Sequence, residues 1–113
     1  MDWKKATPDM IEAFESVAPG GPEAEERKMF GYPCAFVHGN MFMGLHGEGF
    51  VVRLPEPERA ALAAAGGRPF VPMEGRPMRE YMVLPPELYT DPAVLRDWTA
   101  RAYAFASALP AKT

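Results

Sequence analysis

The sequence has few of the residues that carry thiol or metal chemistry. It holds one cysteine, Cys34, and two histidines among 113 residues. A single cysteine cannot form an intrachain disulfide or a multi-cysteine zinc site, which agrees with a reducing compartment. No apolar run approaches the roughly 18 to 20 residues that span a bilayer, and the start, Met1 to Lys5, lacks the apolar stretch of a secretory signal. We therefore expect a cytoplasmic protein.

Positive charge is also scarce. Twelve basic and fifteen acidic residues give a net charge of −3, whereas binding to a phosphate backbone depends on clustered Lys and Arg. The sequence has no glycine-rich phosphate loop, dinucleotide fingerprint or His-Glu-x-x-His pattern. We expect no cofactor and no metal, and the composition disfavours nucleic-acid binding by this domain alone.

Hydrophobic residues, by contrast, are plentiful. They make up 48% of a 12.5 kDa chain, which suffices for one core but not for two independent ones. The sequence therefore predicts a single domain over residues 1–113.

The first half of the chain predicts one helix followed by strands. Thr7 and Pro8 are an N-cap and a first-turn proline, and apolar residues then recur at helical spacing, which predicts a helix over 8–18. The acidic stretch to Glu26 is predicted to be a solvated loop. From Lys28 onward, aromatic and β-branched residues predict an antiparallel meander with a Gly39-Asn40 turn. Its strands are expected at 32–37, 41–45 and 50–54.

The second half predicts two helices and two strands. Pro55 opens a short helix that Gly66-Gly67 closes. A short edge strand is expected around Phe70-Val71, and a clear strand over 79–84 ends at Pro85-Pro86. Asp91-Pro92 caps a last helix with one apolar stripe. The order α-β-β-β-α-β-β-α predicts a two-layer α+β domain, with an antiparallel sheet of about five strands and helices packed on one side.

Several short segments resemble the TfoX amino-terminal-domain family, whose members begin TfoX/Sxy-type competence regulators and also occur alone as short bacterial proteins. The resemblance covers about residues 10 to 109 and rests on Arg27-Lys28-Met29-Phe30-Gly31, Asn40-Met41-Phe42, Pro69-Phe70, Arg79-Glu80-Tyr81 with Pro85, and Asp91-Pro92. It implies a fold similar to that of type III secretion chaperones. It also implies an accessory or regulatory protein, since the family offers no catalytic residue to carry over.

The chain departs from the family pattern in two ways. Members often carry a second glycine after Met-Phe-Gly, where this chain has Tyr32-Pro33-Cys34. Longer TfoX proteins also carry a helical carboxy-terminal domain, which we expect to be absent here. The resemblance therefore implies the stand-alone short form, and the competence role does not carry over directly.

Cys34, His38 and His46 are the only residues that suggest nucleophilic or metal chemistry. With a Gly39-Asn40 turn, His38 pairs with Met41 and Cys34 with Leu45, which leaves His46 on the opposite face. We therefore predict a buried structural cysteine and two hairpin histidines, with no catalytic or metal site.

The predicted hairpin has no plainly polar face. One face would hold, with His38, the side chains of Tyr32, Cys34, Phe36, Met41, Met43 and Leu45, and the other would hold, with His46, those of Ala35, Val37, Phe42 and Gly44. Methionines adapt to varied surfaces, so they either fill the core or line a surface for a protein partner. We favour a homodimer formed through the sheet among the functional interpretations.

The arginines are a second candidate. They could bind an anion or an acidic partner, or be a solvated face paired with glutamates such as Glu48, Glu74 and Glu80. The possible partner or anion surface comprises Arg27, Lys28, Met41, Phe42, Met43, Arg53, Arg79 and Tyr81.

The sequence favours a non-enzymatic accessory or regulatory protein that binds a protein partner, with a second copy as the first to test. One alternative is a small-ligand-binding or enzymatic domain that uses Cys34, Arg53, Arg79 and Tyr81 in a concave pocket. Another is a nucleic-acid-associated regulator, which would require a contiguous basic surface.

Overall fold

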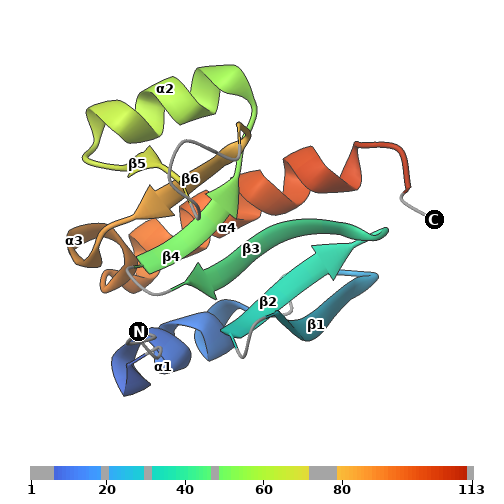
Figure 1. Cartoon of the computed structure of the whole chain (residues 1–113), viewed down its shortest axis with the longest axis horizontal. Coiled ribbons are helices and arrows are strands. Elements are labelled where there is room, and N and C mark those ends of the chain that lie inside the picture. The colour runs from blue at the N-terminus through green and yellow to red at the C-terminus, as the bar shows by residue number, and fades with distance from the viewer. Residues whose placement is uncertain (1–6, 19–20, 30–31, 47–48, 72–78, 112–113) are drawn as a thin grey trace.

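A single six-stranded antiparallel sheet organises the molecule. The computed structural model describes residues 7–18, 21–29, 32–46, 49–71 and 79–111. The helices are α1 (Pro8–Val17), α2 (Glu56–Ala64), α3 (Pro86–Tyr89) and α4 (Pro92–Ser107). The strands are β1 (Ala24–Met29), β2 (Tyr32–Val37), β3 (Asn40–His46), β4 (Gly49–Arg53), β5 (Arg68–Pro69) and β6 (Tyr81–Leu84). They lie in the order β1-β2-β3-β4-β6-β5 (Figure 1).

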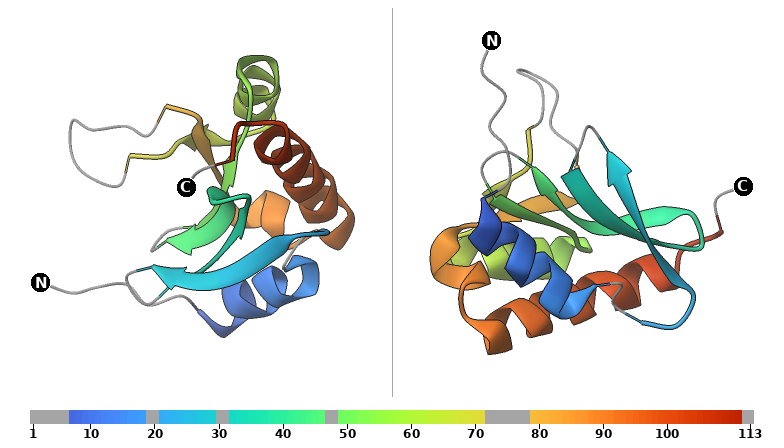
Figure 2. Two further views of the ribbon diagram at one scale, coloured as in Figure 1. Left: turned by 90° about the vertical axis from the view of Figure 1, so that its right-hand side faces the viewer. Right: turned by 90° about the horizontal axis from the view of Figure 1, so that it is seen from below.

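The helices lie on one side of this sheet, as predicted (Figure 2). The longest, α4, packs across β3 and β4, and α1 packs beside it. Leu62 of α2 joins the same core at the β6 side. The fully buried side chains of this core include Phe14, Phe42, Phe50, Leu54, Leu84 and Leu95. The two-layer α+β class expected from the sequence is confirmed.

Local signals account for the helix ends. The Thr7 hydroxyl accepts a hydrogen bond from the Met10 amide at 3.2 Å, and one Asp91 carboxylate oxygen accepts from the amides of Ala93 and Val94. Both caps satisfy amides that have no partner within the helix. Gly66 follows α2 with φ +112°, a conformation that favours glycine.

Three elements differ from the prediction. Strand β1 begins at Ala24, inside the acidic stretch that was predicted to be a loop. Its charged side chains are exposed, but backbone pairing with β2 makes the segment a strand. Helix α3 is a single helical turn that begins at Pro86, where the sequence predicted only the end of the preceding strand. Strand β5 lies just before Phe70, whose amide still donates to the Tyr81 carbonyl. Phe30, Gly31 and residues 72–78 lie outside the described residues.

The β2–β3 turn lies one residue earlier than predicted. Val37 pairs with Asn40, so His38 and Gly39 are the two turn residues, with φ of 52° and 81°. Two left-handed residues are the hallmark of the type I′ hairpin turn. Asn40 is buried in the strand instead, where its amide nitrogen donates to the Pro110 carbonyl at 3.1 Å.

A β-bulge then shifts the register. Phe36 pairs with Met41, but Ala35 pairs with Met43, which leaves Phe42 as the extra residue. The side chains of Phe42 and Met43 both enter the helix-side core as a result. The predicted faces are therefore wrong: Met43 and Leu45 lie on the helix side, and His46 lies on the same face as Cys34.

Candidate functional site: the helix-free face of the sheet

The face of the sheet opposite the helices is built on one cross-strand row. Cys34 pairs with Gly44, Gly44 with Val51, and Val51 with Val83. Directly paired residues of an antiparallel sheet point to the same side, so the whole row lies on this face. Val51 and Val83 pack with Phe70 in a small cluster separate from the main core. We call this surface the helix-free face, and Figure 1 looks onto it with α4 behind the sheet.

A strip of larger side chains crosses this face, and we call it the Met41 strip. It consists of Arg27, Phe36, Met41, Arg53 and Tyr81, which come from five strands. The Arg27 guanidinium lies 5.0 Å from the centre of the Phe36 ring. Phe36 is directly opposite Met41, and the Tyr81 hydroxyl donates a hydrogen bond to the Met41 carbonyl at 3.1 Å. The three apolar members are half-buried, so the strip remains reachable from solvent.

Arg53 lies between Met41 and Tyr81 in the strip, because β4 lies between β3 and β6. The β3–β4 ladder stops at Met43 and Val52, so Arg53 has no partner in β3, and Figure 1 shows the two strands diverging there. Its Nε donates to a Glu80 carboxylate oxygen at 2.9 Å. The guanidinium lies 5.5 Å from the Tyr81 ring and 5.9 Å from the Phe105 ring of α4. Arg53 thus joins the face to the helix behind it.

The environment of Tyr81 favours its neutral phenol. Burial raises the pKa of this side chain, and the nearby Arg53 charge opposes that rise only in part. A neutral phenol is the form that can donate to the Met41 carbonyl. Tyr81 is therefore a positioning contact between β6 and β3.

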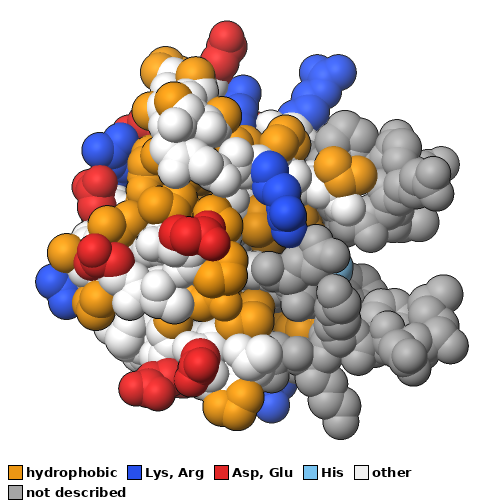
Figure 3. All heavy atoms as spheres, turned by 90° about the vertical axis from the view of Figure 1, so that its left-hand side faces the viewer, with side chains coloured by type: hydrophobic (Ala, Val, Ile, Leu, Met, Phe, Trp, Pro, Cys, Tyr) orange, Lys and Arg blue, Asp and Glu red, His pale blue; other side chains and the backbone are white. Residues whose placement is uncertain are grey.

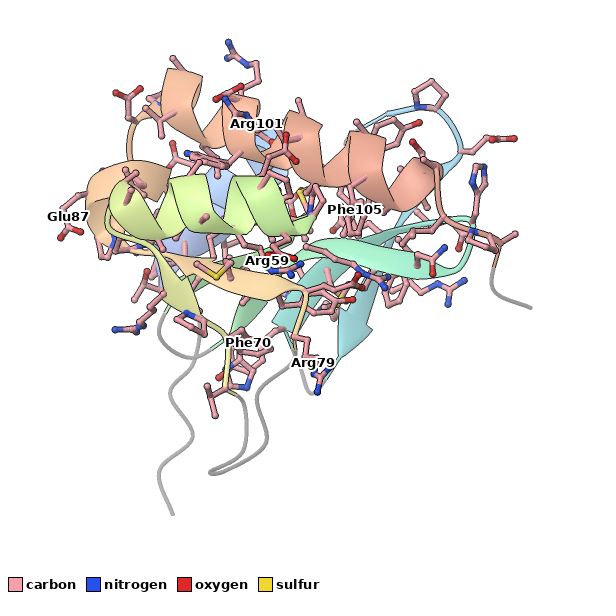
Figure 4. All side chains as sticks on the ribbon, turned by 90° about the horizontal axis from the view of Figure 1, so that it is seen from above. Arg59, Phe70, Arg79, Glu87, Arg101 and Phe105 are labelled. Atoms are coloured by element: carbon pink, nitrogen blue, oxygen red, sulfur yellow. The ribbon has the colours of Figure 1, made fainter. Side chains whose placement is uncertain are left out.

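Aromatic rings occupy another part of the face. The His46 ring lies 5.1 Å from the Phe70 ring, edge-on, and 5.5 Å from the Tyr32 ring. Figure 4 shows Phe70 and Arg79 projecting on the side away from α2 and α4. The sequence placed Phe36 on the same hairpin face as Cys34 and Met41, which the pairing of Phe36 with Met41 confirms, but neither Phe36 nor Phe70 was among the predicted surface residues.

Cys34 lies between these two regions as a buried thiol. Its Sγ donates to the Arg27 carbonyl at 3.4 Å, and burial raises its pKa even though the Arg27 charge opposes that effect. A raised pKa keeps the side chain as a thiol, which is a poor nucleophile and metal ligand. Within the described ranges, no three His, Cys, Asp or Glu side chains gather as a metal site.

The structure separates the eight predicted surface residues into three groups. Arg27, Met41, Arg53 and Tyr81 come together in the Met41 strip. Phe42 and Met43 do not join them, because the bulge buries both in the helix-side core with no exposed area. Lys28 is exposed on β1 next to Arg27, and Arg79 is exposed just before β6.

The helix side has a groove of about 290 Å³ between α1 and the α3–α4 corner. Asp9 and Glu12 line one wall, Arg96 the other, and Leu95 and Tyr89 are among its apolar residues. Cys34, Arg53, Arg79 and Tyr81, the residues of the predicted ligand pocket, are not among its lining residues. The pocket that the sequence suggested and the groove are thus different places.

Charge is divided between the two layers. The helices carry seven acidic and three basic residues, whereas the described strands carry two acidic and four basic ones. The side view in Figure 3 shows acidic side chains spread over the surface rather than gathered in one patch. The basic strand residues are accompanied by acids, as in the pairs Arg27–Glu25 and Arg53–Glu80. The strands are therefore more basic than the helices, but the Met41 strip is close to neutral.

Comparison with known families identifies the domain. None of the helices in the described ranges is long and apolar enough to cross a bilayer. Comparison with curated proteins gives no match. The family model described as the TfoX N-terminal domain matches residues 12–106. Because this match covers most of the chain, the protein belongs to the TfoX N-terminal domain family.

Proposed function

We propose that this domain is a non-enzymatic accessory or regulatory protein that acts by binding another protein through the Met41 strip. Membership of the TfoX N-terminal domain family, which is not a known enzyme family, supports a regulatory or accessory role. We place the protein in the cytoplasm as part of the same proposal, since its one cysteine is a free, buried thiol.

The observation that carries the proposal is the composition of the strip. Phe36, Met41 and Tyr81 are half-buried apolar or amphipathic side chains on a face that no described helix covers. Aromatic residues, Met and Arg are the types enriched at protein interfaces, where rings and a central apolar contact exclude water. The rest of the apolar surface is sparse: Ile11 and Val71 are the large hydrophobic residues exposed elsewhere in the described ranges.

Site-specific photo-crosslinking tests this proposal. The photoreactive residue p-benzoylphenylalanine replaces Met41 in one variant and Ile11 in the control, because Ile11 is 41% exposed on α1, which lies on the helix side of the sheet. We expect light-dependent protein adducts from position 41 in the native host and few from position 11. Equal adduct patterns from the two positions, or none from position 41, would contradict protein binding through the strip.

A further inference from the structure

The Met41 strip has the same kinds of side chain on both sides of Met41. On one side the Arg27 guanidinium lies 5.0 Å from the Phe36 ring and 2.9 Å from a Glu25 oxygen. On the other side the Arg53 guanidinium lies 5.5 Å from the Tyr81 ring and binds Glu80. Met41 touches both halves, since it pairs with Phe36 and accepts from Tyr81. Each half therefore holds an arginine, a glutamate and an aromatic ring, with the ring on the strand next to β3 in one half and the arginine on the strand next to β3 in the other.

We propose that the occupant of the strip is a second copy of this chain, docked face to face about a two-fold axis close to Met41. This inference rests on the proposed function and names its partner. A two-fold interface brings the same patch of both copies together, so the patch must be complementary to itself. About this axis the Arg27–Glu25 half of one copy meets the Arg53–Glu80 half of the other, and methionine meets methionine at the centre.

Charge supports a second copy over a strongly charged partner. A patch with unpaired arginines would repel its own copy, whereas each strip arginine here has its own carboxylate. On docking, every cation of one strip would find an acid both within its own chain and across the interface. Opposite charges that meet at the rim fix the register, and the apolar centre excludes water.

Pairing of two sheets edge to edge is a less favourable way for two copies to form a dimer. Strand β1 is the long edge strand and pairs only with β2. Two copies paired edge to edge about a two-fold axis must place one residue opposite its own copy. Residues 25–28 are all charged, so any such centre within them sets like charges directly opposite, which is destabilising. The charged edge therefore acts against edge pairing.

Light scattering coupled to size exclusion, run over a range of protein concentrations, measures the assembly directly. We expect a mass near twice 12.5 kDa at high concentration. Met41→Glu should give a monomer under the conditions where the unaltered chain is a dimer. Ile11→Glu, the same kind of substitution at an exposed position of α1, should leave the mass unchanged.

A second variant tests the interface without changing Met41, which is half-buried and could affect folding. Arg27 has a 55% exposed side chain, so Arg27→Glu leaves the core intact. It should weaken the dimer about tenfold or more, because the introduced carboxylate would then face Glu80 of the other copy. Arg101→Glu is the matched control: Arg101 also binds a carboxylate, Asp97, and lies 4.6 Å from an aromatic ring, that of Trp98, but it is on α4.

Two results would overturn the second-copy inference. One is a monomeric mass at every concentration, and the other is a dimer that neither Met41→Glu nor Arg27→Glu weakens. Crosslinking at position 41 then distinguishes failure of the second-copy inference from failure of the proposed function. Adducts of twice the chain mass identify a second copy, whereas adducts of other masses would leave protein binding through the strip intact with a different partner.

Discussion

The Tyr81 hydroxyl donates a hydrogen bond to the Met41 carbonyl, although these residues lie 40 positions apart in the chain. The bond joins β6 to β3 across the point where the β3–β4 ladder has already ended. Arg53, bound to Glu80, fills the space between the two strands. Side chains therefore connect β3 and β6 where the backbone ladder between β3 and β4 has ended.

Removal of that hydroxyl should therefore cost stability. We expect Tyr81→Phe to lower the free energy of unfolding by about 1 kcal/mol, because it leaves the Met41 carbonyl without this donor. Urea denaturation measures the change. Tyr89→Phe is the control, since the described contacts give the Tyr89 hydroxyl no hydrogen-bond partner and its loss should change stability little. An equal loss in both variants would argue against the bridging role.

Stability should fall in alkaline solution. Burial raises the pKa values of Cys34, Tyr81 and Tyr89 above their ordinary values of 9.0 for cysteine and 10.0 for tyrosine. As the pH rises through those values, the unfolded chain releases its protons first, so the folded state loses its advantage. Urea denaturation from pH 8 upward should show this decline, and Tyr81→Phe should make it shallower. A stability that rises with pH in that range would contradict these pKa directions.

The placement of the hairpin turn can be tested by three substitutions. Gly39→Ala should destabilise by about 1 to 2 kcal/mol, because φ is +81° there. His38→Gly should cost little or stabilise, since its φ of 52° suits glycine and its contact with Glu23 is exposed. Asn40→Gly should destabilise through loss of the buried bond to Pro110. Thermal or urea unfolding measures all three. If Asn40→Gly instead stabilised the protein, the turn would lie at Gly39-Asn40.

Elements with strong local signals could be predicted from the sequence. The Thr7 and Asp91 caps, the glycine end of α2 and the apolar spacing of α4 each act within a few residues. The two-layer arrangement could also be predicted, because helices with one apolar side must bury it against the sheet. Strand β1 could not be predicted in this way, since its ordering comes from pairing with β2 and its residues resemble those of a solvated loop.

The site was predicted only in part, because register is a non-local property. Asn-Gly is a strong turn signal, and the reversed order Gly39-Asn40 predicts the turn one residue too late. The buried bond from Asn40 to Pro110 places Asn40 in the strand instead. The bulge at Phe42 then moves two of the eight predicted surface residues into the core. Arg27, Met41, Arg53 and Tyr81 still come together, since none of them lies at the extra position.

Close packing at Gly44 gives the last prediction. A Cβ atom at this position would lie 2.9 Å from the Cβ of Cys34 on the paired strand, so Gly44→Ala should destabilise by about 1 to 3 kcal/mol through overpacking. It should also speed the reaction of Cys34 with a thiol reagent, because a strained pair opens more often. Cys34→Gly removes the clashing atom, so the two substitutions combined should cost less than the sum of their separate costs, as a double-mutant cycle from urea unfolding would show. If the two free-energy costs simply added, the Cβ atom at position 44 would not clash with that of Cys34. The packing between β2 and β3 would then be looser at this point than the 2.9 Å distance indicates.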